Sequence, residues 1–167
     1  FFVMAQSTDI RIGFDYGITD KFTLGIARAK GAGPATQLYE GAMKYKFLEQ
    51  NVEGGSPVSA AFFGSALISG TKPSEDVSSP TSYRNFAQRF MYVSQVIVAR
   101  KFSSGLSLEV LPTYVHRNYT AYGDPNGTIA LGMGGRMKVT KRMALVADYF
   151  LPLTRSKDRE RIWGQKY

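Results

Sequence analysis

Cysteine is absent from the 167 residues of the chain, which also contains a single histidine and a single tryptophan. Without cysteine the chain has no disulfide framework and no thiolate metal site. No run of apolar residues approaches the roughly 18 that a transmembrane helix requires. The sequence opens with FFVMAQ, without a basic leader or a cleavable signal, so we expect a mature or partial chain.

Aromatic residues and glycine are abundant, with ten Tyr, eleven Phe and seventeen Gly, a composition that favours β structure. The length is that of one domain, which we assign to residues 1–167. Twenty-one Lys and Arg against thirteen Asp and Glu give a net charge of +8. This charge alone suits nucleic acid, an anionic membrane surface and anionic solutes equally well.

The clearest pattern in the sequence is the alternation in residues 9–28. Side chains of a strand alternate between two faces, so each strand has one set of odd and one set of even positions. In 9–17 the even positions are large and apolar, whereas the odd positions carry Asp9, Arg11, Gly13 and Asp15. The alternation resumes after a short break at 17–21, which predicts a β-hairpin. Its polar face suits the lumen of a small barrel whose outside meets lipid.

Six further stretches repeat this alternation, so eight strands are expected. They span about 9–17, 22–29, 37–48, 57–68, 86–100, 106–117, 128–139 and 143–153. Stretch 86–100 is apolar at both parities, and its faces are left unassigned. Pro112 removes a ladder donor and predicts a bulge or a local defect in stretch 106–117. Residues 69–85 are rich in Ser and Pro and predict an exposed loop.

Short connections alternate with longer ones along the chain, as in outer-membrane barrels with periplasmic turns and external loops. In that arrangement the first strand would begin at the outer rim and the eighth would return to it. Bacterial barrels normally have both termini in the periplasm. We therefore expect at least one more strand at each end, about ten or more in the full protein. By this argument the domain is incomplete at both ends.

The sequence STDIRIGFDYGITDKFTLGIAR, followed by YEGAMKYKFLEQ and PVSAAFFGSA, resembles a family of β-barrels from Bacteroidota outer membranes whose function is unknown. The run at 9–17 is its most specific part, and the similarity covers most of the chain. The resemblance implies an all-β, antiparallel, up-and-down transmembrane barrel in the bacterial outer membrane. It implies no catalytic residues. The expected partners are outer-membrane lipid and, through loops 69–85 and 118–127, other outer-membrane proteins, with no role for nucleic acid.

Two sets of residues are the candidate functional positions. The inner face is expected to hold a network of charges of both signs, which should pair because an unpaired charge away from water is costly. This lumen set is Asp9, Arg11, Asp15, Glu40, Lys44, Lys46, Glu109, Arg136, Lys138 and Asp148. Aromatic side chains near strand ends are expected to form the girdles of a membrane barrel. The girdle set is Tyr16, Phe22, Tyr39, Phe47, Phe102, Tyr114 and Tyr149.

Catalysis has little support in the sequence. His116 is the sole histidine, and a base needs a nucleophile within hydrogen-bond reach. Ser65 stands in FGSAL, which is not a nucleophile elbow. The glycines of LGMGGRMK at 131–138 lack the strand-to-helix transition of a phosphate cradle, and close barrel packing explains them better. We expect no enzyme activity, no cofactor and no metal site.

Three functions remain open from the sequence. The first is a non-catalytic barrel that acts as a structural element or as a membrane-embedded subunit of a larger assembly. The second is a narrow pore in which Lys44, Lys46, Arg136 and Lys138 would favour small anions. The third is a soluble lipocalin-like barrel that binds a ligand, with the apolar face pointing inward.

Overall fold

The computed structural model describes residues 10–30, 37–51, 55–76, 79, 81–120, 125–140 and 142–154. Asp9 of the predicted lumen set lies outside these residues, as does the run 121–124 of the second predicted loop. None of the helical segments in the described ranges is long and apolar enough to cross a membrane.

Eight strands form one antiparallel sheet in which each strand pairs with its neighbours in the sequence. The strands are β1 (Ile10–Gly17), β2 (Phe22–Lys30), β3 (Gln37–Leu48), β4 (Ser59–Ser69), β5 (Phe90–Lys101), β6 (Leu106–Arg117), β7 (Gly127–Lys138) and β8 (Ala144–Pro152). The prediction of an all-β, up-and-down fold is confirmed. It was wrong at 86–89, where a 3-10 helix, η1 (Phe86–Arg89), forms because the Asn85 side chain accepts a hydrogen bond from the Gln88 amide.

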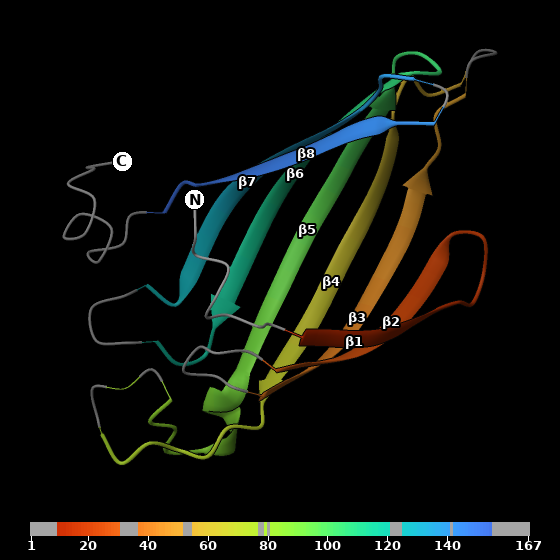
Figure 1. Cartoon of the computed structure of the whole chain (residues 1–167). Helices are drawn as coiled ribbons and strands as arrows, with labels where there is room; N and C mark the ends of the chain where they lie inside the picture. The colour runs from red at the N-terminus through yellow and green to blue at the C-terminus, as the bar shows by residue number, and fades with distance from the viewer. Residues whose placement is uncertain are drawn as a thin grey trace.

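The sheet is strongly curved and has two edges, β1 and β8 (Figure 1). Each edge strand pairs on one side only within the described residues, and both are exposed along nearly their whole length. One end of the strands, which we call the turn end, is formed by Gly17, Phe22, Leu48, Ser59, Lys101, Leu106, Lys138 and Ala144. The opposite end, the loop end, is formed by Lys30, Gln37, Ser69, Phe90, Arg117 and Gly127.

Residues paired across strands share a face, so the register sorts every side chain of the sheet. One set contains the even positions of β1 and β2 and the odd positions of β3, for example Phe14, Ile26 and Gly41 in one row. We call this side the outer face, because most of the large exposed apolar side chains lie on it. The opposite side, the inner face, carries most of the buried positions of the sheet, including Ala61, Ser65 and Leu111.

The register also assigns the faces of β5. Phe90, Tyr92 and Val96 pair with outer-face residues of β4, whereas Val93 and Ile97 pair with inner-face residues. The strand is apolar on both faces because its outer face belongs to the exposed apolar surface and its inner face belongs to the core. Alternation is lost when both faces of a strand are apolar.

Pro112 interrupts the ladder between β5 and β6, as predicted, without a bulge. Pairing stops after Gln95 and Thr113 and resumes at Val98 and Val110 in the same register, while Pro112 still pairs with Leu131 of β7. Side chains bridge the gap: Gln95 Nε2 donates to Thr113 Oγ1 at 2.8 Å, and the Thr113 hydroxyl donates to the carbonyl of Leu111 at 2.9 Å. The first of these bonds joins β5 to β6 beside the proline, and the second lies within β6.

The connection 49–58 is held against the end of β5 by one side chain. Gln50 Nε2 donates to the carbonyl of Lys101 at 2.9 Å, and its Oε1 accepts from the amide of Lys101 at 2.8 Å. The side-chain amide of Gln50 thus acts as a backbone group would in a strand pair. This contact fixes the longest connection of the turn end.

Residues 69–85 were predicted to be an exposed loop too polar to pack, and this is wrong in part. Thr81 and Ser82 are buried, because the Ser79 and Thr81 hydroxyls lie 3.0 Å apart and the Ser74 amide donates to the Thr81 carbonyl. Arg89 Nη1 donates to the carbonyls of Ser69 and Thr71, each at 3.0 Å. Its guanidinium also lies 5.4 Å from the ring centroid of Tyr83.

Replacement of Arg89 by alanine should loosen this connection without unfolding the sheet. Two part-buried carbonyls would lose a charged donor, and hydrogen bonds to charged groups contribute about 1.5–3 kcal/mol. We expect amides of 70–85 to exchange hydrogen about 10- to 100-fold faster, measured by mass spectrometry, with β3 and β6 unchanged. Arg84→Ala is the matched control, since the Arg84 side chain is exposed. Equal exchange in the two variants would show that Arg89 does not anchor the loop.

Candidate functional site

Nine of the ten predicted lumen charges fall in the described residues, and the register places all nine on the inner face. Arg11 and Glu40 lie toward the loop end. The others lie between the middle of the sheet and the turn end: Asp15, Lys44, Lys46, Glu109, Arg136, Lys138 and Asp148. The inner face is therefore charged unevenly along its length.

The expected network of pairs is reduced to one ion pair between strands. Arg11 Nε and Nη2 donate to Glu40 Oε2 at 3.0 and 2.9 Å. Lys46 pairs at 3.1 Å with Glu49, which lies just beyond β3 and outside the predicted set. The remaining members have no ion pair within the described ranges. Geometry explains part of this, because Glu109 and Asp148 flank Gly134 in one row and so place acid beside acid.

The middle of the inner face is apolar, which the predicted charge set did not include. Phe63 of β4, Ile97 of β5, Leu111 of β6 and Phe150 of β8 all lie on this side. Leu111 is only 7% exposed. These residues belong to strands with weak alternation, where only the register separates inner from outer positions.

Two hollows open on the inner face, one on each side of this apolar region. The first has a volume of about 420 Å³ and is lined in part by Asp15, Lys44, Phe63 and Gln95. The second has a volume of about 310 Å³ and is lined in part by Glu109, Leu111, Arg136, Asp148 and Phe150. Each combines charged groups with an aromatic ring, so each offers electrostatic contacts and apolar packing.

A family model described as membrane bound beta barrel domain (DUF5777) matches residues 1–165. The chain belongs to this family. The predicted resemblance to a barrel family of unknown function is confirmed, and the protein is membrane bound. No curated protein and no solved structure shows significant similarity to the chain.

Membership of a membrane-bound barrel family indicates which environment the outer face contacts. Membrane barrels place an apolar band outside and polar groups inside, which is the arrangement of β1 to β3. A soluble lipocalin-like barrel would place the apolar face inside, so that alternative disagrees with the family. The outer face is thus the lipid-contacting face of this membrane barrel domain.

The predicted girdle residues that pair in the register all lie on the outer face, at different heights, whereas Phe47 is exposed at the register shift between Lys46 and Leu48. Tyr16, Phe22 and Phe47 are near the turn end, and Phe102 follows β5 at that end with Arg100 5.0 Å from its ring centroid. Tyr39 and Tyr114 are nearer the loop end. Tyr149 lies in the interior of β8, where it pairs with Met133 of β7. Further rings join them: Tyr45, Phe86, Phe90 and Tyr92. The sequence missed Phe90 and Tyr92 because both faces of β5 are apolar.

His116 and Ser65 lie on opposite faces of the sheet, so they do not form a base and nucleophile pair. His116 pairs with Tyr92 on the outer face, where its Nδ1 lies 3.4 Å from the Tyr114 hydroxyl. Ser65 pairs with Val93 on the inner face. Within the described ranges no group of three His, Asp or Glu side chains is arranged to hold a metal ion.

The predicted loops 69–85 and 118–127 contact each other at the loop end. Asn118 Nδ2 donates to the carbonyl of Ala87 at 2.7 Å, and the rings of Tyr83 and Tyr119 meet edge to face with centroids 5.8 Å apart. The ring of Phe86 is exposed beside these contacts. The two loops therefore form one composite surface.

Proposed function

We propose that this domain is a non-catalytic wall of an outer-membrane barrel in a Bacteroidota bacterium, serving as a structural element or as a membrane-embedded subunit of a larger assembly. The observation that carries the proposal is the apolar middle of the inner face, formed by Phe63, Ile97, Leu111 and Phe150. A water-filled channel requires a polar lining, whereas apolar side chains on the inside suit a filled barrel. The source and the outer-membrane location rest on the resemblance of residues 9–17 and on the long connection 70–89.

The composite loop surface supports a role in an assembly. Its described residues are held by Arg89 and by the Asn118 contact, and the ring of Phe86 is exposed beside them. Ordered loops with an exposed aromatic ring are suited to protein contacts. We propose this surface as the contact site for other outer-membrane proteins.

The two unpaired edges support a barrel with more strands than these eight. Backbone groups in the hydrocarbon must be paired, so a membrane barrel closes completely. β1 and β8 each lack a second partner in the described part of the chain. We propose that further strands complete the ring, to a total of about ten or more.

A narrow anion pore is the second candidate, favoured by the inner-face cations Lys44, Lys46, Arg136 and Lys138. Of these, only Lys46 has an ion pair within the described residues, with Glu49. Planar-bilayer recording on the full-length protein separates the two. We expect a heat-modifiable barrel that gives no stepwise conductance, because the apolar region blocks the inside. Regular conductance steps would overturn the structural role.

If steps occur, charge reversal tests the pore directly. Lys44→Glu with Arg136→Glu should change a preference for anions into a preference for cations, measured as the reversal potential in a salt gradient. Arg28→Glu is the control, because Arg28 lies on the outer face. Unchanged selectivity in the double variant would rule out these cations as the selective lining.

A further inference from the structure

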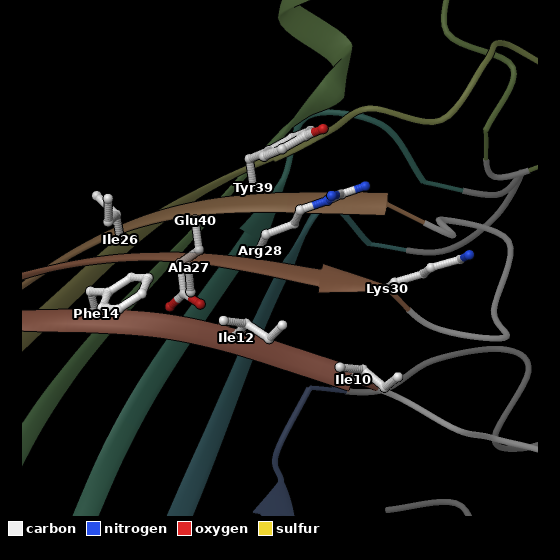
Figure 2. Close-up of a pocket in the computed structure, with 9 residues that line it drawn as sticks. All are labelled: Ile10, Ile12, Phe14, Ile26, Ala27, Arg28, Lys30, Tyr39 and Glu40. Atoms are coloured by element: carbon white, nitrogen blue, oxygen red, sulfur yellow. The ribbon is translucent and has the colours of Figure 1, made fainter.

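A hollow with a volume of about 750 Å³ lies across β1, β2 and β3 toward the loop end. Its apolar wall includes Ile10, Ile12, Phe14 and Ile26, which all belong to the outer face. Figure 2 shows these side chains with Arg28, Lys30 and Tyr39 on one side of the strands, while Glu40 points to the other side. The hollow is thus a groove on the lipid-contacting surface, of a size that suits a small ligand.

Two cations stand at the loop end of this groove. Lys30 pairs with Ile10 and Arg28 pairs with Ile12, so each cation lies beside an apolar residue of β1. The next row, Phe14 with Ile26, is entirely apolar. Positively charged heads above an apolar floor match the two parts of a lipid, a charged headgroup and an acyl chain.

Neither Arg28 nor Lys30 has an ion pair with another described residue. Within the described residues neither has a carboxylate within 4.0 Å, and the intervening segment 31–36 contains no acidic residue. Glu40, the nearest acid in the groove lining, pairs with Arg11 on the inner face. The two cations are therefore free to bind an external anion.

Tyr39 holds the guanidinium of Arg28 in a position from which it can bind an external anion. It pairs with Arg28 in the register, and the guanidinium lies 5.7 Å from the centroid of its ring. A cation over an aromatic face is held in place while its N–H groups stay available. Arg28 and Lys30 are two residues apart on one face of β2, about 7 Å along the strand, so their long side chains can reach the same phosphate.

We propose that this groove binds one anionic phospholipid of the surrounding membrane, with its phosphate held by Arg28 and Lys30 and an acyl chain against Ile12, Phe14 and Ile26. The arrangement makes the domain select its annular lipid by charge at this position. Arg100 shows what an ordinary interfacial cation looks like in the same barrel. It also lies on the outer face and over an aromatic ring, Phe102, but the positions two residues away from it, Val98 and Phe102, carry no second cation.

The test is native mass spectrometry of the delipidated full chain in detergent, with phosphatidylglycerol or phosphatidylcholine added. We expect a single saturable phosphatidylglycerol adduct that forms in preference to the zwitterionic lipid. Each cation near an anionic lipid contributes about 5-fold in affinity, so Arg28→Gln with Lys30→Gln should weaken the adduct about 25-fold. Arg100→Gln should leave it unchanged. Unchanged heat modifiability of both variants is the folding control.

Three results would overturn the proposal. Equal binding of the two lipids would show that charge does not select the occupant. Equal losses in Arg100→Gln and in the double variant would show general surface attraction instead of a built groove. A protein dimer that dissociates in the double variant would assign the groove to a second copy of the chain. The planar-bilayer outcome is independent of all three, so the lipid site and the proposed function can fail separately.

Discussion

Replacement of Gly132 by valine should destabilise the barrel domain by about 3 kcal/mol, the upper end of the usual cost of overpacking. Gly132 lies on the inner face of β7 between Leu111 and Phe150. A Cβ atom at this position would stand 2.9 Å from the Cβ of Leu111 and 2.5 Å from the Cε1 of Phe150. The Phe150 ring can turn, but the Leu111 Cβ moves only with its backbone. Urea unfolding of the folded protein in detergent micelles measures the loss.

Gly41→Val is the matched control for this prediction. Gly41 is an exposed outer-face glycine of β3, and a Cβ added there would meet no atom within 4 Å. Valine suits a strand better than glycine does, so this variant should be neutral or slightly stabilised. In the double variant Gly132→Val with Phe150→Ala, the valine should cost less stability than it does alone, because one of the two contacts that crowd it has been removed. Equal stability of the Gly132 and Gly41 variants would contradict the crowded inner face.

Replacement of Met133 by lysine should destabilise the membrane-embedded domain by about 2–4 kcal/mol. Met133 is near the middle of β7 on the outer face, between Val110 and Tyr149, and it is exposed. Lysine at mid-height on the lipid face must place its charge in hydrocarbon or bend toward the headgroups. Unfolding in phospholipid vesicles, followed by Tyr and Trp fluorescence or by heat modifiability, measures the loss.

Met137→Lys is the matched control. It makes the same Met-to-Lys change on the same strand and face as Met133→Lys and differs only in its distance from the turn end. Met137 pairs with Leu145 near the turn end, where a lysine should cost about 0–1 kcal/mol because its ammonium group reaches water. A larger loss of stability in Met133→Lys than in Met137→Lys would show that the outer face of β7 contacts the membrane interior. Two small and equal losses would mean that the outer face is not in the membrane interior.

The sequence predicted the strands well where one face is polar. In β1 and β3 charged or small residues alternate with large apolar ones, because one face meets lipid and the other faces inward. In β4 and β5 the same pattern fails, because Phe63 and Ile97 on the inner face are as apolar as the residues outside. Alternation in the sequence appears only when the two faces of a strand differ in polarity, and the two faces of β4 and β5 differ little.

The candidate site was predictable as a set of positions but not as a set of contacts. Arg11 and Glu40 stand on β1 and β3, and their pairing depends on the small Ala27 and Ala29 of β2 between them. The polar loop 69–85 was predicted to be exposed because composition does not show which hydroxyl groups bond the backbone and allow burial. The groove at Arg28 needed the register, which places Ile10 and Ile12 beside the two cations.

The order of strands in the sheet has a consequence for how the domain assembles. Every pair in the described sheet joins strands that are consecutive in the sequence, so each hairpin can form from a short stretch of chain before distant parts arrive. Growth of the sheet then proceeds by addition of one strand at a time to a free edge. Closure of the ring requires β1 and β8 each to gain a second partner strand, and it is therefore the last step of assembly. Variants that slow closure should accumulate as open sheets with both edges available for pairing.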